Sequence, residues 1–553
     1  MEEIESYPLS TLPGTTALFR NFTKMAALPD RTGVRRWYPA DPFSLGWAAS
    51  SPRLEAERRL ELASALAEQA KQMAAGPAAL ANIASLREGA AAVVTGQQVS
   101  LFGGPLLTLL KAATAVRKAQ DATAASGRMH VPIFWMASED HDLAEADQVA
   151  LLSKTGGQAT VETLRLGIEV SRPLPVGGLR LGDGGGASKE SLEVTLDRAC
   201  ALLGWSPICD LLRECYAPGA TMASAFGKLL SKIFAAHGLV VMDAGSRAFH
   251  AMGAGVLRAA LERSDEMREL LLQRSLELEE HGYHAQVLVT ADHSLLFLLD
   301  QESGARRPLL RLEQGGWKAG AKAYTTADLL EVLATEPERL SPNALLRPVF
   351  QDAILPTAAY VGGPAEVAYF AQAEVLYRQI LGRVTPVLPR MMATLVEPAI
   401  ANTLAAHELR FSDVLEAKTA AALAQKMGAR AMPIEGKRKL AAVGNTLEAE
   451  LAALTAYMAS LSAELGRAAG VSASKMRYQM NRLRRMAANF EVQKESSLNR
   501  HAAAIMLNLF PEGHLQERVL GGIWFLARHD EDLAAHLIQH ASVERAEHQV
   551  LSL

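Results

Sequence analysis

Four ionisable residues stand side by side in the stretch FWMASEDHDLAE at positions 134–145: Glu139, Asp140, His141 and Asp142. They follow directly on the apolar run VPIFWM, which is typical of a buried strand. Crowded carboxylates push one another's pKa values apart, and a neighbouring carboxylate raises the pKa of a histidine. Such a group can supply a general base at neutral pH, so we predict that these four residues are catalytic.

The same residues also fit the start of a helix. Ser138 or Asp140 would then be the N-cap, and the other acids would lie at the positive end of the helix dipole. The sequence leaves both interpretations open. One histidine with adjacent acids does not have the spacing of a metal site, so we predict no metal.

A second polar stretch, VVTGQQVSLFGGPLLTLLK at 93–111, also follows an apolar run. Its glycines allow a ligand to approach the backbone, and Pro105 suits the first position of a helix whose N-terminus would favour an anion. We predict that Lys111, on that helix, holds a substrate carboxylate. The other predicted substrate-binding residues of this stretch are Thr95, Gly96, Gln97, Gln98, Gly103 and Gly104.

A third stretch, LLRPVFQDAILPTAAYVGGPAEVAYFAQ at 345–372, repeats the order of strand, Gly-Gly-Pro and helix. Arg347 and Arg390 are candidates for holding a carboxylate with two hydrogen bonds. Salt bridges within the protein are the more common role for any one arginine, and that alternative stays open. The predicted substrate-binding residues here are Tyr360, Gly362, Gly363 and Glu366, together with the two arginines.

Apolar runs at 91–96, 131–138, 237–245 and 384–389 predict strands that alternate with helices. This order favours a mostly parallel α/β sheet, in which ligands bind outside the carboxyl ends of the strands. The three polar stretches follow the carboxyl ends of predicted strands, which explains why charged residues come directly after a buried apolar run. We expect residues 1–50 to be irregular and a helical region to begin near Ser51 and Pro52.

Two heptad runs after about Pro398 predict a pair of helices that turn near Gly470. An antiparallel coiled coil, which commonly supports a dimer, and a compact helical bundle both fit this pattern. The runs are Leu447, Leu451, Leu454, Met458, Leu461 and Leu465, then Met476, Met480, Leu483, Ala487 and Phe490. We predict a core at 1–398 with insertions at about 151–190 and 284–345, a coiled-coil domain at 399–508, and a helical segment at 509–553 that returns to the core.

The bulk composition limits the function. The chain has 553 residues, enough for two or three structural units, and its net charge of −4 gives no general attraction to nucleic acids or anionic lipids. It shows no signal peptide and no apolar stretch long enough to span a bilayer. Cys200, Cys209 and Cys215 cannot all pair, so we expect buried thiols in a cytoplasmic protein.

Several long motifs together resemble the cysteine-adding enzymes of bacillithiol biosynthesis, also called cysteine ligases, from about Leu12 to the end of the chain. The motifs are TGQQVSLFGGPLLTLLKA, VPIFWMASEDHDLAEADQV, SPNALLRPVFQDAILPTAAYVGGPAEVAYFAQ, TPVLPRMMATLVEP and LFPEGHLQERVL. The resemblance implies a Rossmann-like nucleotidyltransferase core with connecting-peptide insertions, an α-helical coiled-coil domain and a homodimer. It also implies the last step of bacillithiol synthesis, in which the carboxyl group of L-cysteine is joined to the amine of glucosaminyl-malate. ATP is the expected activator of the acid.

The second stretch is also similar to the first strand, turn and helix of pantothenate synthetases, which hold ATP phosphates with an H-x-G-H sequence. This chain has Phe102-Gly103-Gly104-Pro105 there, so both histidines are absent. An adenylate-forming ligase for another acid and amine is therefore the second hypothesis, and a nucleotide-responsive coiled-coil assembly protein is the third. Lys475, Arg477 and Arg482 could contact a nucleotide, although a solvated coiled-coil flank is the more common explanation of such a basic run.

Overall fold

Each predicted apolar run is a strand of one parallel five-stranded sheet. The strands are β2 (Ala91–Gln98), β3 (His130–Ala137), β6 (Val240–Asp243), β12 (Thr357–Gly362) and β13 (Val387–Pro389). Their order is β13-β12-β2-β3-β6 in the computed structural model. The chain moves outward from β2 through β3 to β6, then returns to the other side of β2 with β12 and β13. The order therefore reverses between β2 and β12, where sheets of this kind bind ligands.

The structure describes residues 1–25, 33–50, 52–153, 159–168, 170, 173–182, 187–290, 292–312, 315–529, 532–541 and 546–553. The expected N-cap Ser51 lies outside these residues, and the first long helix, α2 (Ala56–Gln72), begins further on.

Helices cover both faces of the parallel sheet, which explains why its strands read as continuous apolar runs. Along β3, Val131, Ile133 and Trp135 join one buried cluster, and Phe134 and Met136 join another. The first cluster includes residues of α2 and α3 (Pro77–Arg87), and the second includes residues of α4 (Leu107–Ser126) and α8 (Met222–Ile233). Further core helices are α9 (Arg247–Glu262), α10 (Ser264–Glu280), α12 (Arg347–Ile354) and α13 (Pro364–Leu381).

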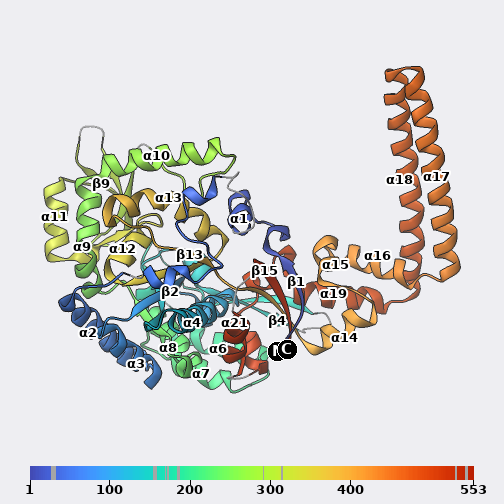
Figure 1. Cartoon of the computed structure of the whole chain (residues 1–553). Helices are drawn as coiled ribbons and strands as arrows, with labels where there is room; N and C mark the ends of the chain where they lie inside the picture. Colours follow the sequence, from blue (N-terminus) through green and yellow to red (C-terminus); the bar gives the residue numbers. More distant parts are fainter. Residues whose placement is uncertain are drawn as a thin grey trace.

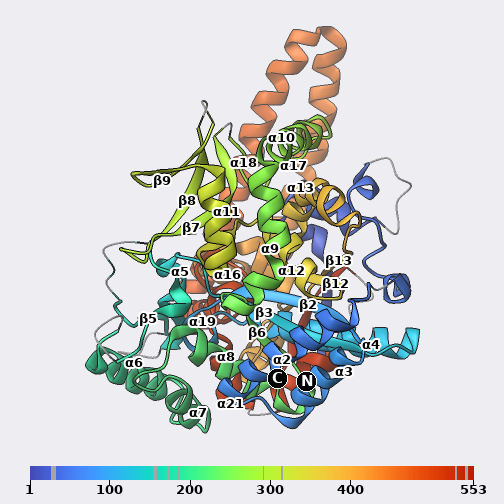
Figure 2. The same cartoon turned by 90° about the vertical axis from the view of Figure 1, so that its left-hand side faces the viewer.

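Both predicted insertions contain antiparallel strands that form sheets separate from the parallel sheet (Figure 2). The first begins with the hairpin of β4 (Gln148–Ser153) and β5 (Thr160–Arg165), and α6 (Lys189–Leu202) and α7 (Ile208–Cys215) follow it. The three cysteines lie buried on α6 and α7 as free thiols, as predicted. The second insertion is a sheet of order β10-β9-β8-β7-β11 beside α11 (Thr326–Thr335). Its strands are β7 (His293–Leu299), β8 (Arg306–Arg311), β9 (Trp317–Ala319), β10 (Lys322–Tyr324) and β11 (Leu340–Pro342).

An antiparallel coiled coil of α17 (Ile434–Leu461) and α18 (Ala463–Lys494) protrudes from the body (Figure 1). This confirms the coiled coil, but the turn lies at Ser462 and not at Gly470, which is inside α18. Ser462 leaves the helical conformation with φ −160° and ψ 139°, and its side chain accepts a hydrogen bond from the Glu464 N–H as the N-cap of α18. The base of the coiled coil is formed by α14 (Pro398–Ala406), α15 (Phe411–Ala417), α16 (Ala420–Ala431) and α19 (Ser497–Leu509).

The predicted coiled-coil seam is only partly buried. Leu451 and Met480 are buried, whereas Leu454, Leu461 and Leu483 are exposed. Gly444, Gly466 and Ala473 are buried in their place, so the two helices meet along small residues. A hairpin of two helices can cover one narrow stripe, and the remaining apolar residues stay on its surface.

Strands also form at both ends of the chain, where irregular and helical structure was expected. β1 (Glu2–Pro8) pairs with β15 (Glu547–Ser552), which in turn pairs with β14 (Met392–Val396). The two termini therefore lie side by side (Figure 1). A short helix α1 (Ala17–Phe22) follows β1, and α20 (Gln516–Val519), α21 (Gly522–His529) and α22 (Asp532–His540) precede β15. Among the described helices, none combines the length and the apolar character needed to cross a membrane.

Candidate active site

A cleft of about 610 Å³ lies at the carboxyl ends of the parallel strands, at the reversal of strand order. Its walls come from the turns after β2, β3 and β12, from the second insertion and from the C-terminal segment. The predicted site residues that line it are Gly96, Gln97, Gln98, Lys111, Glu139, Asp140, His141, Arg347, Tyr360, Gly363, Glu366 and Arg390. The fold thus brings together the three polar stretches that lie far apart in the sequence.

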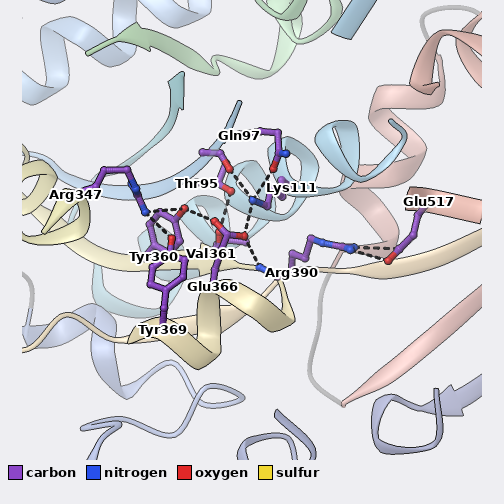
Figure 3. Close-up of polar contacts among 12 residues, drawn as sticks. Thr95, Gln97, Lys111, Arg347, Tyr360, Val361, Glu366, Tyr369, Arg390 and Glu517 are labelled. Atoms are coloured by element: carbon purple, nitrogen blue, oxygen red, sulfur yellow. Dashed lines mark hydrogen bonds and ion pairs between the residues drawn. The ribbon is translucent and has the colours of Figure 1, made fainter. Parts of the chain in front are cut away.

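Glu366 holds the centre of a buried polar network (Figure 3). Its carboxylate lies 2.5 Å from Lys111 Nζ, accepts a hydrogen bond from the Tyr360 hydroxyl at 2.6 Å and accepts another from the Gly363 N–H at 2.7 Å. Burial would raise the pKa of Glu366, but Lys111 and the Gly363 N–H hold that pKa below its usual value. Lys111 Nζ also donates to Gly96 O at 2.6 Å and Gln97 Oε1 at 2.9 Å, so α4, α13 and the end of β2 share one network.

The two predicted arginines also have partners within the protein (Figure 3). Arg347 donates to the Tyr369 hydroxyl at 2.9 Å and to Gln351 Oε1 at 3.0 Å, and its guanidinium lies 5.3 Å from the centre of the Tyr360 ring. Arg390 forms a bidentate pair with Glu517, at 3.0 and 2.6 Å, and both side chains are almost wholly buried. These arginines therefore help to fix the cleft walls.

The acidic residues of the loop after β3 make different contacts. Glu139 Oε1 lies 3.0 Å from Nε2 of His250, a fully buried residue of α9. Asp140 accepts a hydrogen bond from the His141 N–H at 2.7 Å, and Asp142 caps the short helix α5 (Leu143–Ala146) through the Glu145 N–H. The helix does begin at this loop, but its N-cap is Asp142 and neither Ser138 nor Asp140 as predicted. Glu139, Asp140 and His141 line the cleft, and their catalytic role stays a prediction.

His141 lies between the core and the second insertion. Arg306, on β8, places Nη1 3.5 Å from His141 Nδ1 and packs its guanidinium 3.7 Å from the centre of the Phe297 ring. Asp140 Oδ1 is 3.7 Å from the same imidazole nitrogen. The histidine therefore faces the cleft with a carboxylate and a guanidinium beside it, an arrangement suited to moving a proton.

Other predicted residues support the cleft without lining it. Thr95 donates to Val361 O at 2.9 Å, which ties β2 to β12 beside Gly362. Gly103 and Gly104 have φ values of +84° and +70° in the turn before α4, a conformation that glycine adopts without strain. Gly104 O accepts from the Gly522 N–H at 3.1 Å, so this turn binds the C-terminal segment.

The three basic residues predicted to contact a nucleotide lie on α18 of the protruding coiled coil. They are Lys475, Arg477 and Arg482, and none of them lines the cleft. Arg477 forms a bidentate pair with Glu448 of α17 at 2.7 Å.

Sequence reasoning did not single out His250, Arg306, Glu517 or Arg518. His250 and Arg306 lie in segments whose patterns indicate only a helix and an insertion. Glu517 and Arg518 fall within LFPEGHLQERVL, but nothing in that motif shows that it returns to the cleft. Their contribution depends on contacts between elements that are distant in the sequence.

The end of β2 leaves no room for a side chain at Gly96. A Cβ atom there would lie 2.7 Å from Trp135 O, so Gly96→Ala should push β2 and β3 apart at the cleft. We expect the free energy of unfolding to fall by about 1–3 kcal/mol in urea titrations. Gly255→Ala is the matched control, because Gly255 is an exposed position of α9 and no atom lies within 4 Å of its added Cβ. Equal stability of the two variants would contradict this packing argument.

The Glu139–His250 pair predicts a pH-dependent contribution to stability. Burial lowers the pKa of His250, but the adjacent Glu139 carboxylate more than offsets this and raises the pKa above its usual value. The contribution is then fully present below the unfolded-state pKa of about 6.5 and is lost as the pH rises through the folded-state value. Glu139→Gln should therefore reduce the unfolding free energy more at about pH 6 than at about pH 9.

This difference is measured by urea unfolding of both proteins at the two pH values. Arg306 and Asp243 also lie beside this pair, and burial raises the pKa of Asp243. Ser138 and the Gly245 N–H donate to Asp243, so Ser138→Ala serves as a control for the titration of Asp243. A loss of stability that is the same at both pH values would contradict a charged His250.

Comparisons with known proteins agree with this architecture. The family model for "Bacillithiol biosynthesis BshC, N-terminal Rossmann-like domain" matches residues 31–391, and the model for the "C-terminal coiled-coil domain" of the same family matches residues 393–553. A relative from Koribacter versatilis, named "Putative cysteine ligase BshC", is 41% identical over 552 residues, which cover 98% of each chain. A relative of the same name from Solibacter usitatus is 34% identical over 545 residues, again 98% of each chain. The chain therefore belongs to the BshC family of bacillithiol biosynthesis.

Proposed function

We propose that this protein joins the carboxyl group of L-cysteine to the amine of glucosaminyl-malate in the last step of bacillithiol synthesis. The observation that carries the proposal is the composition of the cleft, which combines a proton-accepting group with fixed cations. His141, Asp140 and Glu139 line it together with Lys111, Arg390 and Arg518. An acceptor that carries an amine and two carboxylates is complementary to this distribution of charge.

His141 is the residue that we assign to the proton transfer. The amine of glucosamine is protonated at neutral pH and cannot attack an acyl group until it loses a proton. His141 accepts that proton, while Asp140 stabilises the imidazolium that forms. Formation of an amide from a free acid also requires activation, and we assign this role to ATP.

The coiled coil is the proposed dimerisation element. It keeps apolar side chains on its surface, including Leu454, Tyr457 and Leu461 of α17 and Leu465 and Phe490 of α18. Exposed apolar side chains on a protruding hairpin are consistent with an interaction surface. A homodimer in the cytoplasm is therefore part of the proposal.

The proposal is tested in the cells that make this protein. We would delete the gene, label thiols with a fluorescent bimane and quantify bacillithiol and glucosaminyl-malate by mass spectrometry. Loss of bacillithiol with accumulation of glucosaminyl-malate is expected, and a plasmid copy of the gene should reverse both. Loss of bacillithiol without accumulation of glucosaminyl-malate would place the protein at a different step.

A further inference from the structure

The cationic side chains around the cleft differ in whether they already have a hydrogen-bond or ion-pair partner within the protein. Lys111 contacts Glu366, Arg390 contacts Glu517, and Arg347 contacts Tyr369. Arg306 donates to Ser341 Oγ at 3.0 Å and Pro342 O at 3.1 Å. Arg518 is exposed and lines the cleft, yet its guanidinium has no hydrogen bond or ion pair within the part of the chain that the structure describes.

Buried polar residues fix the backbone that presents Arg518. Directly before it, Gln516 bonds to both the N–H and the carbonyl of Leu395, each at 2.8 Å, and Glu517 binds Arg390 and the Ala393 N–H. Gln516 and Glu517 are 1% and 0% exposed. Burial of a charged pair is favourable only with such complete partners, so the position of α20 is tightly determined.

The residues after Arg518 are fixed as well. Leu520 O accepts from the Leu106 N–H at 2.8 Å, and the Gly521 N–H donates to Ala150 O at 2.8 Å. α20 is therefore attached to β14 on one side and to the start of α4 and β4 on the other. The backbone on both sides of Arg518 is therefore fixed, and the Arg518 guanidinium lies at the cleft without a partner among the described residues.

We propose that Arg518 binds a carboxylate of the malate group of the acceptor and so determines which amine enters the cleft. This inference rests on the proposed function and names the residue that recognises the acidic end of that substrate. A guanidinium offers two parallel N–H donors that match a carboxylate, and it stays charged at any physiological pH. Partial desolvation in the cleft and the neighbouring Arg390 lower the pKa of Arg518, whereas the carboxylates of Glu517 and Glu366 raise it, so a bound carboxylate would further favour the charged guanidinium.

The test compares Arg518→Ala and Arg518→Lys with the unmodified protein by titration calorimetry. The probes are glucosaminyl-malate, methyl glucosaminide, which has the amine but no malate, L-malate and ATP. Arg518→Ala should weaken binding of glucosaminyl-malate by about 10- to 100-fold and leave methyl glucosaminide and ATP unchanged. The affinity of Arg518→Lys for glucosaminyl-malate should lie between those of Arg518→Ala and the unmodified protein, because lysine keeps the charge but not the paired donors. Arg500→Ala, an exposed arginine of α19 that does not line the cleft, is the matched control.

The outcomes separate this inference from the proposed function. Unchanged binding of glucosaminyl-malate to Arg518→Ala would overturn the role of Arg518 and leave the proposed function standing. Loss of ATP binding alone would also overturn it, because the anion would then be a phosphate. If the unmodified protein binds L-malate through Arg518 but does not bind glucosaminyl-malate, the carboxylate site stands and the proposed acceptor falls. Binding of none of the probes would overturn both.

Discussion

His141→Ala is expected to lower the rate of bacillithiol formation by about 100- to 10,000-fold, the usual contribution of a general base. His141 is the imidazole at the cleft that lies beside Asp140 and Arg306. Asp142, and not His141, caps α5, so the substitution removes no structural contact of the cap. The unfolding free energy should therefore change by about 1 kcal/mol or less, because the half-buried side chain loses only its contacts with Asp140, Arg306 and Phe297.

The measurement is product formation from L-cysteine, glucosaminyl-malate and ATP, followed by mass spectrometry, together with urea unfolding of the same samples. His284→Ala is the control, because His284 is exposed and does not line the cleft. Full activity of His141→Ala would exclude it as the base. Loss of stability together with activity would instead indicate that His141 has a structural role.

Glu517→Ala is expected to reduce the unfolding free energy by about 3–5 kcal/mol, which is the usual effect of removing one member of a buried ion pair. The substitution leaves Arg390 charged, 2% exposed and without its carboxylate, and it also removes the acceptor of the Ala393 N–H. Glu517 links the C-terminal segment to the end of the parallel sheet. We therefore expect the cleft to lose its C-terminal wall before the rest of the protein unfolds.

Urea unfolding measures the first effect, and limited proteolysis between α19 and β15 measures the second. Glu450→Ala, on the exposed surface of α17, is the matched control and should change little. The double variant Arg390→Met with Glu517→Leu should recover much of the lost stability, because an apolar pair leaves no uncompensated charge. A single variant as stable as the unmodified protein would show that Arg390 finds another partner.

The position of the cleft follows from features that the sequence carries locally. Apolar runs such as VPIFWM bury both faces of a strand, and the polar residues after them must lie at the carboxyl edge of the sheet. Residues as distant as Gln97, His141 and Glu366 were therefore predicted to meet, and the structure brings them to one cleft. The heptad runs likewise predicted a pair of adjacent helices, because their spacing repeats within each helix, but the choice between a coiled coil and a compact bundle needed the structure.

Tertiary structure alone decided which cations at the cleft have partners within the protein. The sequence could not show that Lys111, Arg347 and Arg390 have partners and that Arg518 has none in the described part of the chain, because partners such as Glu366 and Glu517 approach from other elements. The pairing of β1 with β15 escaped prediction for a related reason, whereas the turn at Ser462 depends on a local N-cap that the choice of Gly470 overlooked. Helical spacing and strand propensity are local properties, whereas a partner hundreds of residues away is fixed only when the whole chain packs.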